Sequence, residues 1–322
     1  MLKLIYRGKR KYLCFILAGV ILLAFVVMHH RDDSRQVIKT LAYQNIAFNF
    51  DPENRNVNPS GLWIYNMKTK KLHMVGSELT YESDCDFQDN KVLGWIDSDV
   101  VEVDIESGET TILCRGTWDD VALIPFTLKY RPGSLDFSGL TNEGELVLWE
   151  REKGEFRSLA WFDWNGWSFS YSWAGDGTML FVPDKTGIAT IDLNTLTQNH
   201  WLTLPITYPV PLEHVFSPYY RKSFEVAKDG TCVVYRNGSE LRFVEVTENG
   251  DVSETVVLDQ DVGAQCGFSI APDSKTIVFT MTRDKKTLFL AYYYEVWLYD
   301  KEKLVKILNS YEDINGEVSV FW

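Results

Sequence analysis

The stretch IAPDSKTIVF (270–279) has two near copies earlier in the chain, WAGDGTMLFV (173–182) and VAKDGTCVVY (226–235). Each copy begins with an apolar residue and a small one, passes through Asp and then Gly or Ser, and ends in an apolar run. Weaker copies are FQDNKVLGW (87–95) and LTNEGELVLW (140–149). Because Asp-Gly pairs favour tight turns, we predict that each copy is the turn between the first and second strands of a repeating unit.

A second pattern recurs after these turns: two alternating strands separated by a short polar stretch. The five examples are GLWIYNMKTKKLHMV (61–75), DVVEVDIESGETTIL (99–113), GIATIDLNTLTQNHWLTL (187–204), LRFVEVTENGDVSETVVL (241–258) and YEVWLYDKEKLVKIL (294–308). The three strong turn copies start 53 and 44 residues apart, which leaves room for four strands in each repeat. Such a period is typical of a β-propeller, and we find no convincing amphipathic helix after residue 40.

The last repeat, IAPDSKTIVFTMTRDKKTLFLAYYYEVWLYDKEKLVKIL (270–308), resembles a blade of the TolB-type propellers, whose repeats are WD40-like. The matching residues are Ala271, Pro272, Asp273, Ser274, Ile277, Phe279, Trp297, Leu298 and Asp300. The resemblance covers about residues 43–322, although only this repeat matches closely. It implies a shape. Because the family serves mostly in binding proteins and also as the lid domain of some peptidases, the resemblance implies no particular reaction.

The two ends of the repeat region complement each other. GEVSVFW (316–322) has the pattern of a first strand, whereas residues 44–76 supply only the later strands of a repeat. We therefore expect the ends to share one blade, which closes the ring and leaves no sheet edge free. The expected blades are 44–76 with 316–322, 81–114, 118–160, 166–204, 213–258 and 264–309. The predicted fold is all-β, a propeller of six blades, or of seven if 118–173 contains an extra one.

The amino-terminal part of the chain differs from the rest in charge and hydropathy. Residues 1–11 hold five basic side chains and no acid, and residues 12–28, YLCFILAGVILLAFVVM, hold no charge. Seventeen helical residues rise about 25 Å, the short end of what spans a bilayer. We predict a cytoplasmic basic stub at 1–11, a transmembrane signal anchor at 12–28, a juxtamembrane stalk at 29–42 and an extracytoplasmic β-propeller at 43–322.

The basic flank on the amino side of this segment sets the expected topology. It favours a single-pass protein of the cell membrane, with the N-terminus in the cytoplasm and the propeller outside. A cleaved signal peptide is one alternative, but residues 26–30 offer no small residue at a cleavage position. A buried core helix is another alternative, and the one-sided basic flank argues against it. The membrane, contacted through residues 12–28, is thus the first expected partner.

The net charge of −13 averages two unlike regions. Beyond residue 11, 27 basic side chains stand against 45 acidic ones, a balance of −18. Because a nucleic-acid binder needs a basic surface, we expect no nucleic-acid partner. The sequence contains no HExxH, GxSxG or P-loop pattern, and no GxGxxG after a strand. We therefore predict no catalytic residue and no cofactor.

Other residues with metal-binding or redox chemistry are scattered. His73, His200 and His214 stand isolated, and the acidic residues between Asp84 and Asp120 lack EF-hand spacing, so we predict solvated turn carboxylates and no metal site. Four cysteines outside the apolar segment lack CxxC spacing: Cys85, Cys114, Cys232 and Cys266. Cys85 with Cys114 and Cys232 with Cys266 would each link neighbouring strands, and four free buried thiols are the alternative.

Tryptophan is concentrated in one part of the chain. Six of the 11 residues fall within 56 positions: Trp118, Trp149, Trp161, Trp164, Trp167 and Trp173. The segment WFDWNGW (161–167) has the character of a hairpin tip, where exposed rings could stack on sugars or anchor a peptide. Large rings could instead fill the wedges between blades. We take Trp161, Trp164 and Trp167 as the candidate ligand or partner surface.

Two functions of different classes fit these observations. The preferred one is a membrane-anchored, extracytoplasmic binding or scaffolding module for a protein, a peptide or a glycan. The alternative is an enzyme or enzyme subunit of the hydrolase or lyase type, with its site in the central channel of the propeller. A ring of inward carboxylates with a perturbed histidine would favour the enzyme, whereas an exposed, Trp-rich apolar patch would favour binding.

Overall fold

The regular elements in the described part of this chain are antiparallel β-strands. The computed structural model describes residues 45–52, 61–76, 86–88, 90–118, 121–124, 127–162, 170–206, 222–238, 240–258, 267–284, 292–301, 303–309 and 316–321. Within them, six sheets have four strands each and a seventh has two. No helix among these residues is long and apolar enough to cross a membrane, and the predicted anchor at 12–28 lies outside them.

The first three four-stranded sheets each run from an inner strand to an outer one. The first contains, in this order, β26 (Gly316–Phe321), β1 (Asn45–Pro52), β2 (Gly61–Asn66) and β3 (Lys71–Gly76). The second contains β4 (Asp86–Gln88), β5 (Lys91–Ile96), β6 (Asp99–Asp104) and β7 (Thr110–Arg115). The third contains β10 (Lys129–Tyr130), β11 (Phe137–Leu140), β12 (Glu145–Glu150) and β13 (Glu155–Trp161).

The other sheets follow the same order. The fourth contains β14 (Ser172–Trp173), β15 (Met179–Pro183), β16 (Gly187–Asp192) and β17 (Thr197–Thr203). The fifth contains β18 (Phe224–Val226), β19 (Cys232–Asn237), β20 (Glu240–Val246) and β21 (Val252–Leu258). The sixth contains β22 (Phe268–Ile270), β23 (Ile277–Asp284), β24 (Tyr292–Tyr299) and β25 (Leu304–Asn309). The small sheet pairs β8 (Thr117–Trp118) with β9 (Val121–Ala122).

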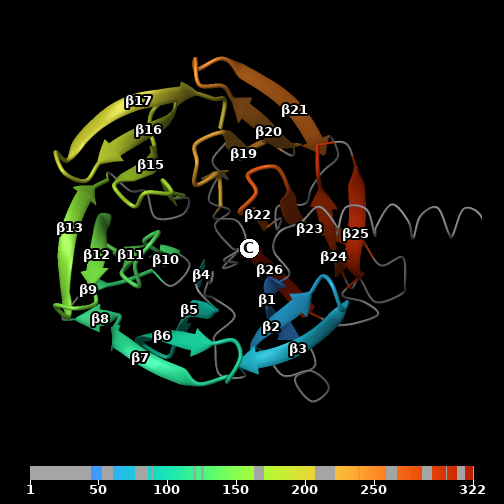
Figure 1. Cartoon of the computed structure of the whole chain (residues 1–322), viewed down its shortest axis with the longest axis horizontal. Coiled ribbons are helices and arrows are strands. Elements are labelled where there is room, and N and C mark those ends of the chain that lie inside the picture. The colour runs from blue at the N-terminus through green and yellow to red at the C-terminus, as the bar shows by residue number, and fades with distance from the viewer. Residues whose placement is uncertain are drawn as a thin grey trace, which may run out of the picture. The chain divides into compact units, whose positions relative to one another are not determined.

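These sheets succeed one another around a ring (Figure 1), with β4, β22 and β26 near its centre and β3, β7, β17 and β25 at its rim. The expected all-β propeller is therefore confirmed. The expected sharing of one sheet by the two ends of the region is also confirmed, because β26 pairs with β1 along its whole length, from Ala47 opposite Phe321 to Pro52 opposite Gly316. This pairing closes the ring through backbone hydrogen bonds.

The predicted turns and hairpins occupy these sheets with one exception. The strong copies at 173–182, 226–235 and 270–279 each join a first strand to a second, as does 87–95. The prediction is wrong for 140–149, which joins β11 to β12, the second and third strands. In that sheet the first turn is RPGSLD (131–136), where Pro-Gly takes the place of Asp-Gly. A pair such as Asp-Gly or Pro-Gly indicates a turn, but it does not show which two strands of the repeat the turn joins.

One irregularity recurs in every four-stranded sheet. The third and fourth strands shift register once, so that the outer strand holds one extra residue. The extra residues are all apolar: Val75, Leu113, Leu159, Trp201, Val257 and Ile307. A bulge bends and twists its strand, and the first five of these side chains pack against a hydrophobic cluster between two sheets. The bulge therefore helps to fold the rim strand over the core.

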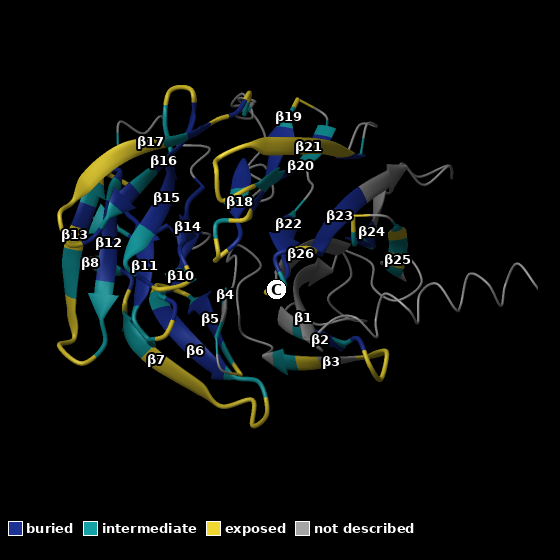
Figure 2. Ribbon diagram, turned by 45° about the horizontal axis from the view of Figure 1, so that its top comes forward, coloured by how far each residue is buried: buried dark blue, intermediate teal, exposed yellow. Residues whose placement is uncertain are grey.

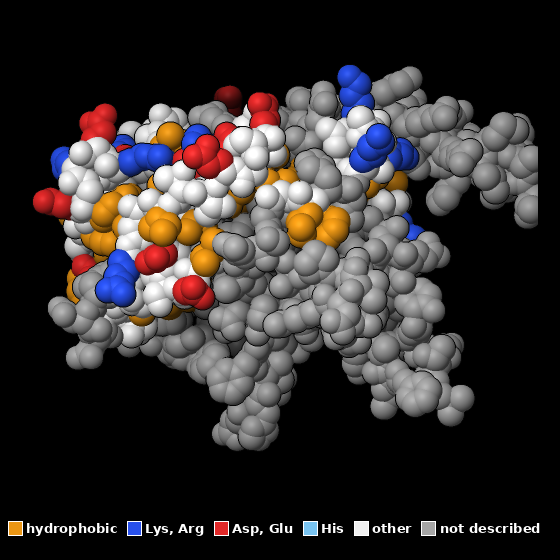
Figure 3. All heavy atoms as spheres, turned by 90° about the horizontal axis from the view of Figure 1, so that it is seen from below, with side chains coloured by type: hydrophobic (Ala, Val, Ile, Leu, Met, Phe, Trp, Pro, Cys, Tyr) orange, Lys and Arg blue, Asp and Glu red, His pale blue; other side chains and the backbone are white. Residues whose placement is uncertain are grey.

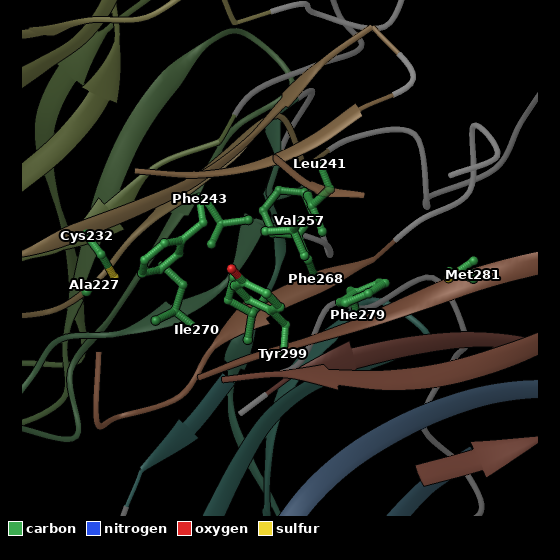
Figure 4. Close-up of a cluster of buried hydrophobic side chains, with 12 residues drawn as sticks. Ala227, Cys232, Leu241, Phe243, Val257, Phe268, Ile270, Phe279, Met281 and Tyr299 are labelled. Carbon is green, nitrogen blue, oxygen red and sulfur yellow. The ribbon is translucent and has the colours of Figure 1, made fainter. Parts of the chain in front are cut away.

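The core lies between neighbouring sheets. The cluster between the fifth and sixth sheets brings Phe243 and Val257 from one sheet against Phe268, Phe279 and Tyr299 from the other (Figure 4). Comparable clusters join the other successive sheets from the first to the fifth. Burial falls from the inner strands to the rim (Figure 2): β19 is almost wholly buried, whereas five of the seven residues of β21 are exposed. The packing of sheet faces on one another thus holds the ring together.

The two ends of the ring differ in their connections. At one end, which we name the short-turn end, two to six residues join first to second and third to fourth strands. Neighbouring first turns, or strand residues next to them, bond to each other there. The bonds run from Gln88 Nε2 to the Ser134 carbonyl, from Arg131 Nε to the Gly177 carbonyl (2.9 Å), from the Gly175 amide to the Lys228 carbonyl (2.5 Å) and from Cys232 Sγ to the Ser274 carbonyl (3.2 Å).

Candidate functional site

The opposite end, which we name the long-connection end, carries the second-to-third connections and the links between sheets. The longest link, between β17 and β18, has 20 residues, and the link between β13 and β14 has 10. The strand ends that border these links are described, although several of the links are not. Binding residues are found disproportionately on connections that a rigid scaffold positions, so a binding site is expected at this end.

Trp161 is the most exposed tryptophan of the described residues whose side chains are placed, with 63% of its surface accessible. It is the last residue of β13 and stands opposite Glu145 of β12. Its neighbours Ala160 and Phe162 pack against the cluster between the third and fourth sheets, and the Phe162 amide donates to the Gly144 carbonyl at 2.9 Å. Because side chains alternate along a strand, burying both neighbours turns the Trp161 ring to solvent.

The other tryptophans of the cluster have different environments. Trp173 is buried, and its Nε1 donates to Ser138 Oγ at 2.9 Å. The Trp149 ring lies 4.7 Å from that of Phe156, against the core between the second and third sheets. Both therefore fill wedges between sheets. Trp164 and Trp167 lie outside the described residues, so the surface predicted from Trp161, Trp164 and Trp167 stays a prediction, with Trp161 exposed as it requires.

Acidic side chains accompany Trp161. Glu145 is partly buried opposite it, and Glu143 is exposed in the turn between β11 and β12. Neither carboxylate forms an ion pair with another residue of the described part of the chain. Figure 3 shows one face of the molecule, on which described hydrophobic side chains lie among charges of both signs. The end of the third sheet that bears Trp161 is thus an aromatic surface with negative charge beside it.

A polar network at the long-connection end of the fourth sheet was not evident from the sequence. Asp184 Oδ2 lies 2.5 Å from His200 Nδ1, and His200 Nε2 lies 2.9 Å from Thr203 Oγ1. The other oxygen of Asp184 accepts the amides of Thr186 and Gly187. Burial raises the pKa of Asp184, but the bonds from His200 and Thr186 outweigh it and lower the pKa below the usual value.

The order carboxylate, imidazole, hydroxyl in this network matches that of a nucleophilic relay. However, His200 and Thr203 are exposed on the rim strand β17, and all its residues come from one sheet. The contacts hold the β15–β16 turn against the outer strand. The register of β17 shifts next to His200, where Trp201 is the extra residue. Because of this shift, the side chains of His200 and Thr203 lie on the same side of the strand. We interpret the network as a structural one that stabilises this turn at the surface.

The inner strands were the predicted place for an enzyme site. Asp86 of β4 accepts the Tyr130 amide at 2.7 Å, and Glu225 of β18 pairs with Lys222 and accepts from Ser269 Oγ at 3.3 Å. These carboxylates join neighbouring strands and sheets. Histidines within the described residues lie on outer strands, His73 on β3 and His200 on β17. The arrangement that would favour the enzyme is therefore not seen among the inner strands that the structure describes.

Among the charged residues whose burial the structure describes, Glu102 of β6 is the most deeply buried, with only 2% of its surface exposed. Its carboxylate lies 2.5 Å from Lys91 Nζ and 2.7 Å from Arg151 Nη1, and accepts from Tyr130 Oη at 3.1 Å. Burial raises its pKa, but the bonds to Arg151 and Lys91 outweigh burial and lower it, whereas burial and the carboxylate raise the pKa of Tyr130. Because its partners come from the second and third sheets, this cluster ties the two sheets together.

Metal and thiol chemistry receive little support from the described residues. No group of three metal-ligating side chains occurs in this part of the chain. Asp104, one of the acidic residues between Asp84 and Asp120, caps its own turn by accepting the amides of Glu106 and Ser107. Burial raises the pKa of the Cys114 thiol to about 12 and also raises that of Cys232. Cys85 and Cys266 lie outside the described residues, so the two disulfide pairings stay predictions.

Comparison with known proteins identifies the class of fold. No known protein-family model matches the sequence, and no curated protein matches it at a significant level. The structure is similar to TolB from Acinetobacter baumannii, with a TM-score of 0.58 and 11% identity, over 87% of this chain and 66% of that one. A protein assigned to TolB from Agrobacterium tumefaciens gives a TM-score of 0.52 and 10% identity, over 87% and 98%. Oligogalacturonate lyase from Vibrio parahaemolyticus gives 0.42 and 15%, over 68% of each chain.

The chain thus has the β-propeller fold of these TolB structures, and the expected resemblance to TolB-type propellers is confirmed at the level of the fold. It spans 66% of the length of the Acinetobacter TolB. Identities of 10–15% show the fold alone, and a TM-score of 0.42 is too low for the lyase to carry an argument about chemistry. The function must therefore be argued from this chain's own residues.

Proposed function

We propose that this protein is a binding or scaffolding module, a β-propeller held outside the cell membrane by a single anchor at 12–28. It recognises a protein, a peptide or a glycan through the long-connection end of its third sheet. Trp161 is the described anchor of that surface, and Trp164 and Trp167 are its proposed companions. The six four-stranded sheets serve as six blades of one rigid ring.

The exposed ring of Trp161 is the observation that carries this proposal. Fully exposing a large aromatic side chain is unfavourable in water, and such rings commonly serve as anchors of interfaces. Trp161 ends a strand whose other apolar residues face the core, so its position is held rigidly. A rigid anchor loses little conformational entropy on binding, which favours recognition by this side chain.

The membrane part of the proposal rests on charge and hydropathy. The uncharged segment 12–28 follows five basic residues, and the region beyond it has a net charge of −18. Basic residues are retained on the cytoplasmic side, whereas the acidic domain would be repelled by anionic lipid. External protease added to intact cells should therefore degrade the propeller. Its protection under conditions that degrade known external proteins would contradict this topology.

Crosslinking of the full chain in the cells that produce it tests the binding function. We expect the wild-type protein to yield a reproducible crosslinked partner and the Trp161→Ala variant to lose it. Ile112→Ala is the matched control, because Ile112 is 65% exposed on the rim strand β7 of another sheet. The control should retain the partner. An unchanged crosslink in Trp161→Ala would show that binding takes place elsewhere on the protein.

A further inference from the structure

The bases of the β12–β13 hairpin lie toward its short-turn end. At the short-turn end, Arg151 bonds to Glu102 at 2.7 Å and Lys153 to Glu150 at 2.7 Å. Arg157, the base farther along β13, lies 3.7 Å from Glu150. The three bases of the β12–β13 hairpin are therefore each matched with an acid.

At the other end of the same hairpin, the described residues include acids without bases. Glu145 stands opposite Trp161, and Glu143 lies in the adjoining turn, whose Gly144 carbonyl accepts the amide of Phe162. Residues directly opposite each other in an antiparallel pair have Cβ atoms about 5 Å apart, within reach of a shared ligand group. Lys185, in the turn between β15 and β16, is the nearest base in sequence at this end of the next sheet.

An indole face beside carboxylates selects for a particular ligand chemistry. The negative face of the ring attracts Lys and Arg side chains, and a neighbouring carboxylate adds direct attraction to the same cation. A neutral sugar would gain from the ring alone, and an acidic peptide would be repelled. The −18 balance beyond residue 11 adds long-range attraction for a cationic partner.

We infer that the surface formed by Trp161, Glu143 and Glu145 binds a cationic segment, containing Lys or Arg, of a partner protein. This inference rests on the proposed binding function. It narrows the ligand from a protein, a peptide or a glycan to a protein segment that carries positive charge. The cationic side chain lies over the Trp161 ring, and the two carboxylates bind it from beside the ring.

Fluorescence anisotropy with the full chain in detergent micelles tests the inference. The probe is a labelled peptide of alternating lysine and glycine, compared with its glutamate counterpart and with labelled chitotetraose. We expect the lysine peptide to bind most tightly, with an affinity that falls as salt rises. Trp161→Ala should weaken its binding about fivefold, the upper range for an exposed cation–π contact.

A pair of charge-matched variants separates the local surface from the acidity of the whole domain. Glu143→Gln with Glu145→Gln should weaken binding of the lysine peptide about threefold. The control, Glu152→Gln with Glu155→Gln, removes the same charge from exposed residues at the other end of the hairpin and should change affinity less than about 1.5-fold. Equal weakening by both pairs would overturn the inference, because it would show attraction to the acidic domain as a whole.

Two other outcomes separate this inference from the function on which it rests. If Trp161→Ala loses the cellular partner, but chitotetraose or the glutamate peptide binds as well as the lysine peptide, the binding function stands and the cationic specificity is wrong. If Trp161→Ala changes neither the cellular crosslink nor the affinity for the lysine peptide, both are wrong.

Discussion

The short-turn end and the long-connection end of this ring are built from the same strands but carry different tasks. At the short-turn end, connections of two to six residues bond to one another from sheet to sheet, and a buried carboxylate ties two sheets together. At the long-connection end, links of up to 20 residues leave the strands, and Trp161 faces solvent. The difference indicates that the contacts between sheets are concentrated in the strands and short turns, whereas the other end carries the surface that we propose for binding.

Opening the ring should have the largest effect on this comparison. Removing residues 316–322 takes away β26, which pairs with β1 from Ala47 to Pro52. We expect the free energy of unfolding to fall by more than about 5 kcal/mol, most of the stability of an ordinary domain. Urea denaturation followed by circular dichroism measures it. Ile112→Ala, at an exposed residue of the rim strand β7, is the control, and should cost less than about 1 kcal/mol.

A glycine at the short-turn end provides the next test. Gly177 has φ +66°, and a Cβ there would meet the Pro132 carbonyl oxygen of the neighbouring turn at 2.8 Å. We expect Gly177→Ala to lower the free energy of unfolding by about 2–3 kcal/mol, from backbone strain and the clash together. Gly133 has φ +73° with open space around it, so Gly133→Ala should cost about 1 kcal/mol. Equal costs would show that the turns need not pack against each other.

The buried carboxylate of Glu102 makes the stability depend on pH. Its pKa in the folded protein is lowered below the usual 4.5, chiefly because the bonds from Arg151 and Lys91 outweigh the effect of burial. Its contribution is therefore present above the unfolded pKa and is lost as the pH falls through the folded one. Glu102→Gln should cost about 1–2 kcal/mol near neutral pH, since its basic partners are partly exposed.

Thermal unfolding between about pH 5 and about pH 3 checks the sign of this effect. The wild-type protein should lose more stability over that interval than Glu102→Gln, so the two curves should converge at the acid end. Other carboxylates with lowered pKa, such as Asp176 and Asp229, also contribute to acid sensitivity, so the difference between the two proteins is the quantity to compare. Parallel curves would mean that Glu102 does not titrate as described.

The smallest expected change in stability is at the long-connection end. Trp161→Ala should alter the free energy of unfolding by less than about 0.5 kcal/mol, because an exposed side chain away from the core contributes little. The same substitution at the buried Trp173 should cost about 3–5 kcal/mol. Guanidinium denaturation of both variants measures the contrast. A large cost at Trp161 would place that ring in the structural core rather than on a binding surface.

The sequence predicted the strands well where the Asp-Gly turns repeat. The Asp-Gly turns at 173–182 and 226–235 join the strands assigned to them, but the turn at 140–149 occupies a different position in its sheet. The bulges were not predicted, although their signal is present. In each outer strand an apolar extra residue is followed by another apolar residue or glycine, as in Leu159-Ala160 and Trp201-Leu202, which breaks the alternation of a regular strand.

The candidate site divides in the same way. Trp161 was expected to be exposed at a hairpin tip in WFDWNGW (161–167), and the structure shows it exposed at the end of the outer strand β13, before the link to the next sheet. The contact between Asp184 and His200 depends on the pairing of two strands across a register shift, which residue identities do not specify. Likewise, the separation of Glu143 from the bases of its hairpin becomes visible only when the strand pairing shows which charges share an end.

The amino-acid sequence by itself determined that this is a repeating all-β ring closed by its last strand, because turns, alternation and repeat length are local properties of the chain. The tertiary structure alone decided which turns touch, which partners surround Glu102 and which end of the β12–β13 hairpin holds its bases. These depend on contacts between residues 11 to 53 positions apart, such as those of Lys91 with Glu102 and of Gly175 with Lys228. Packing of one sheet on the next brings such residues together, and no local pattern encodes that arrangement.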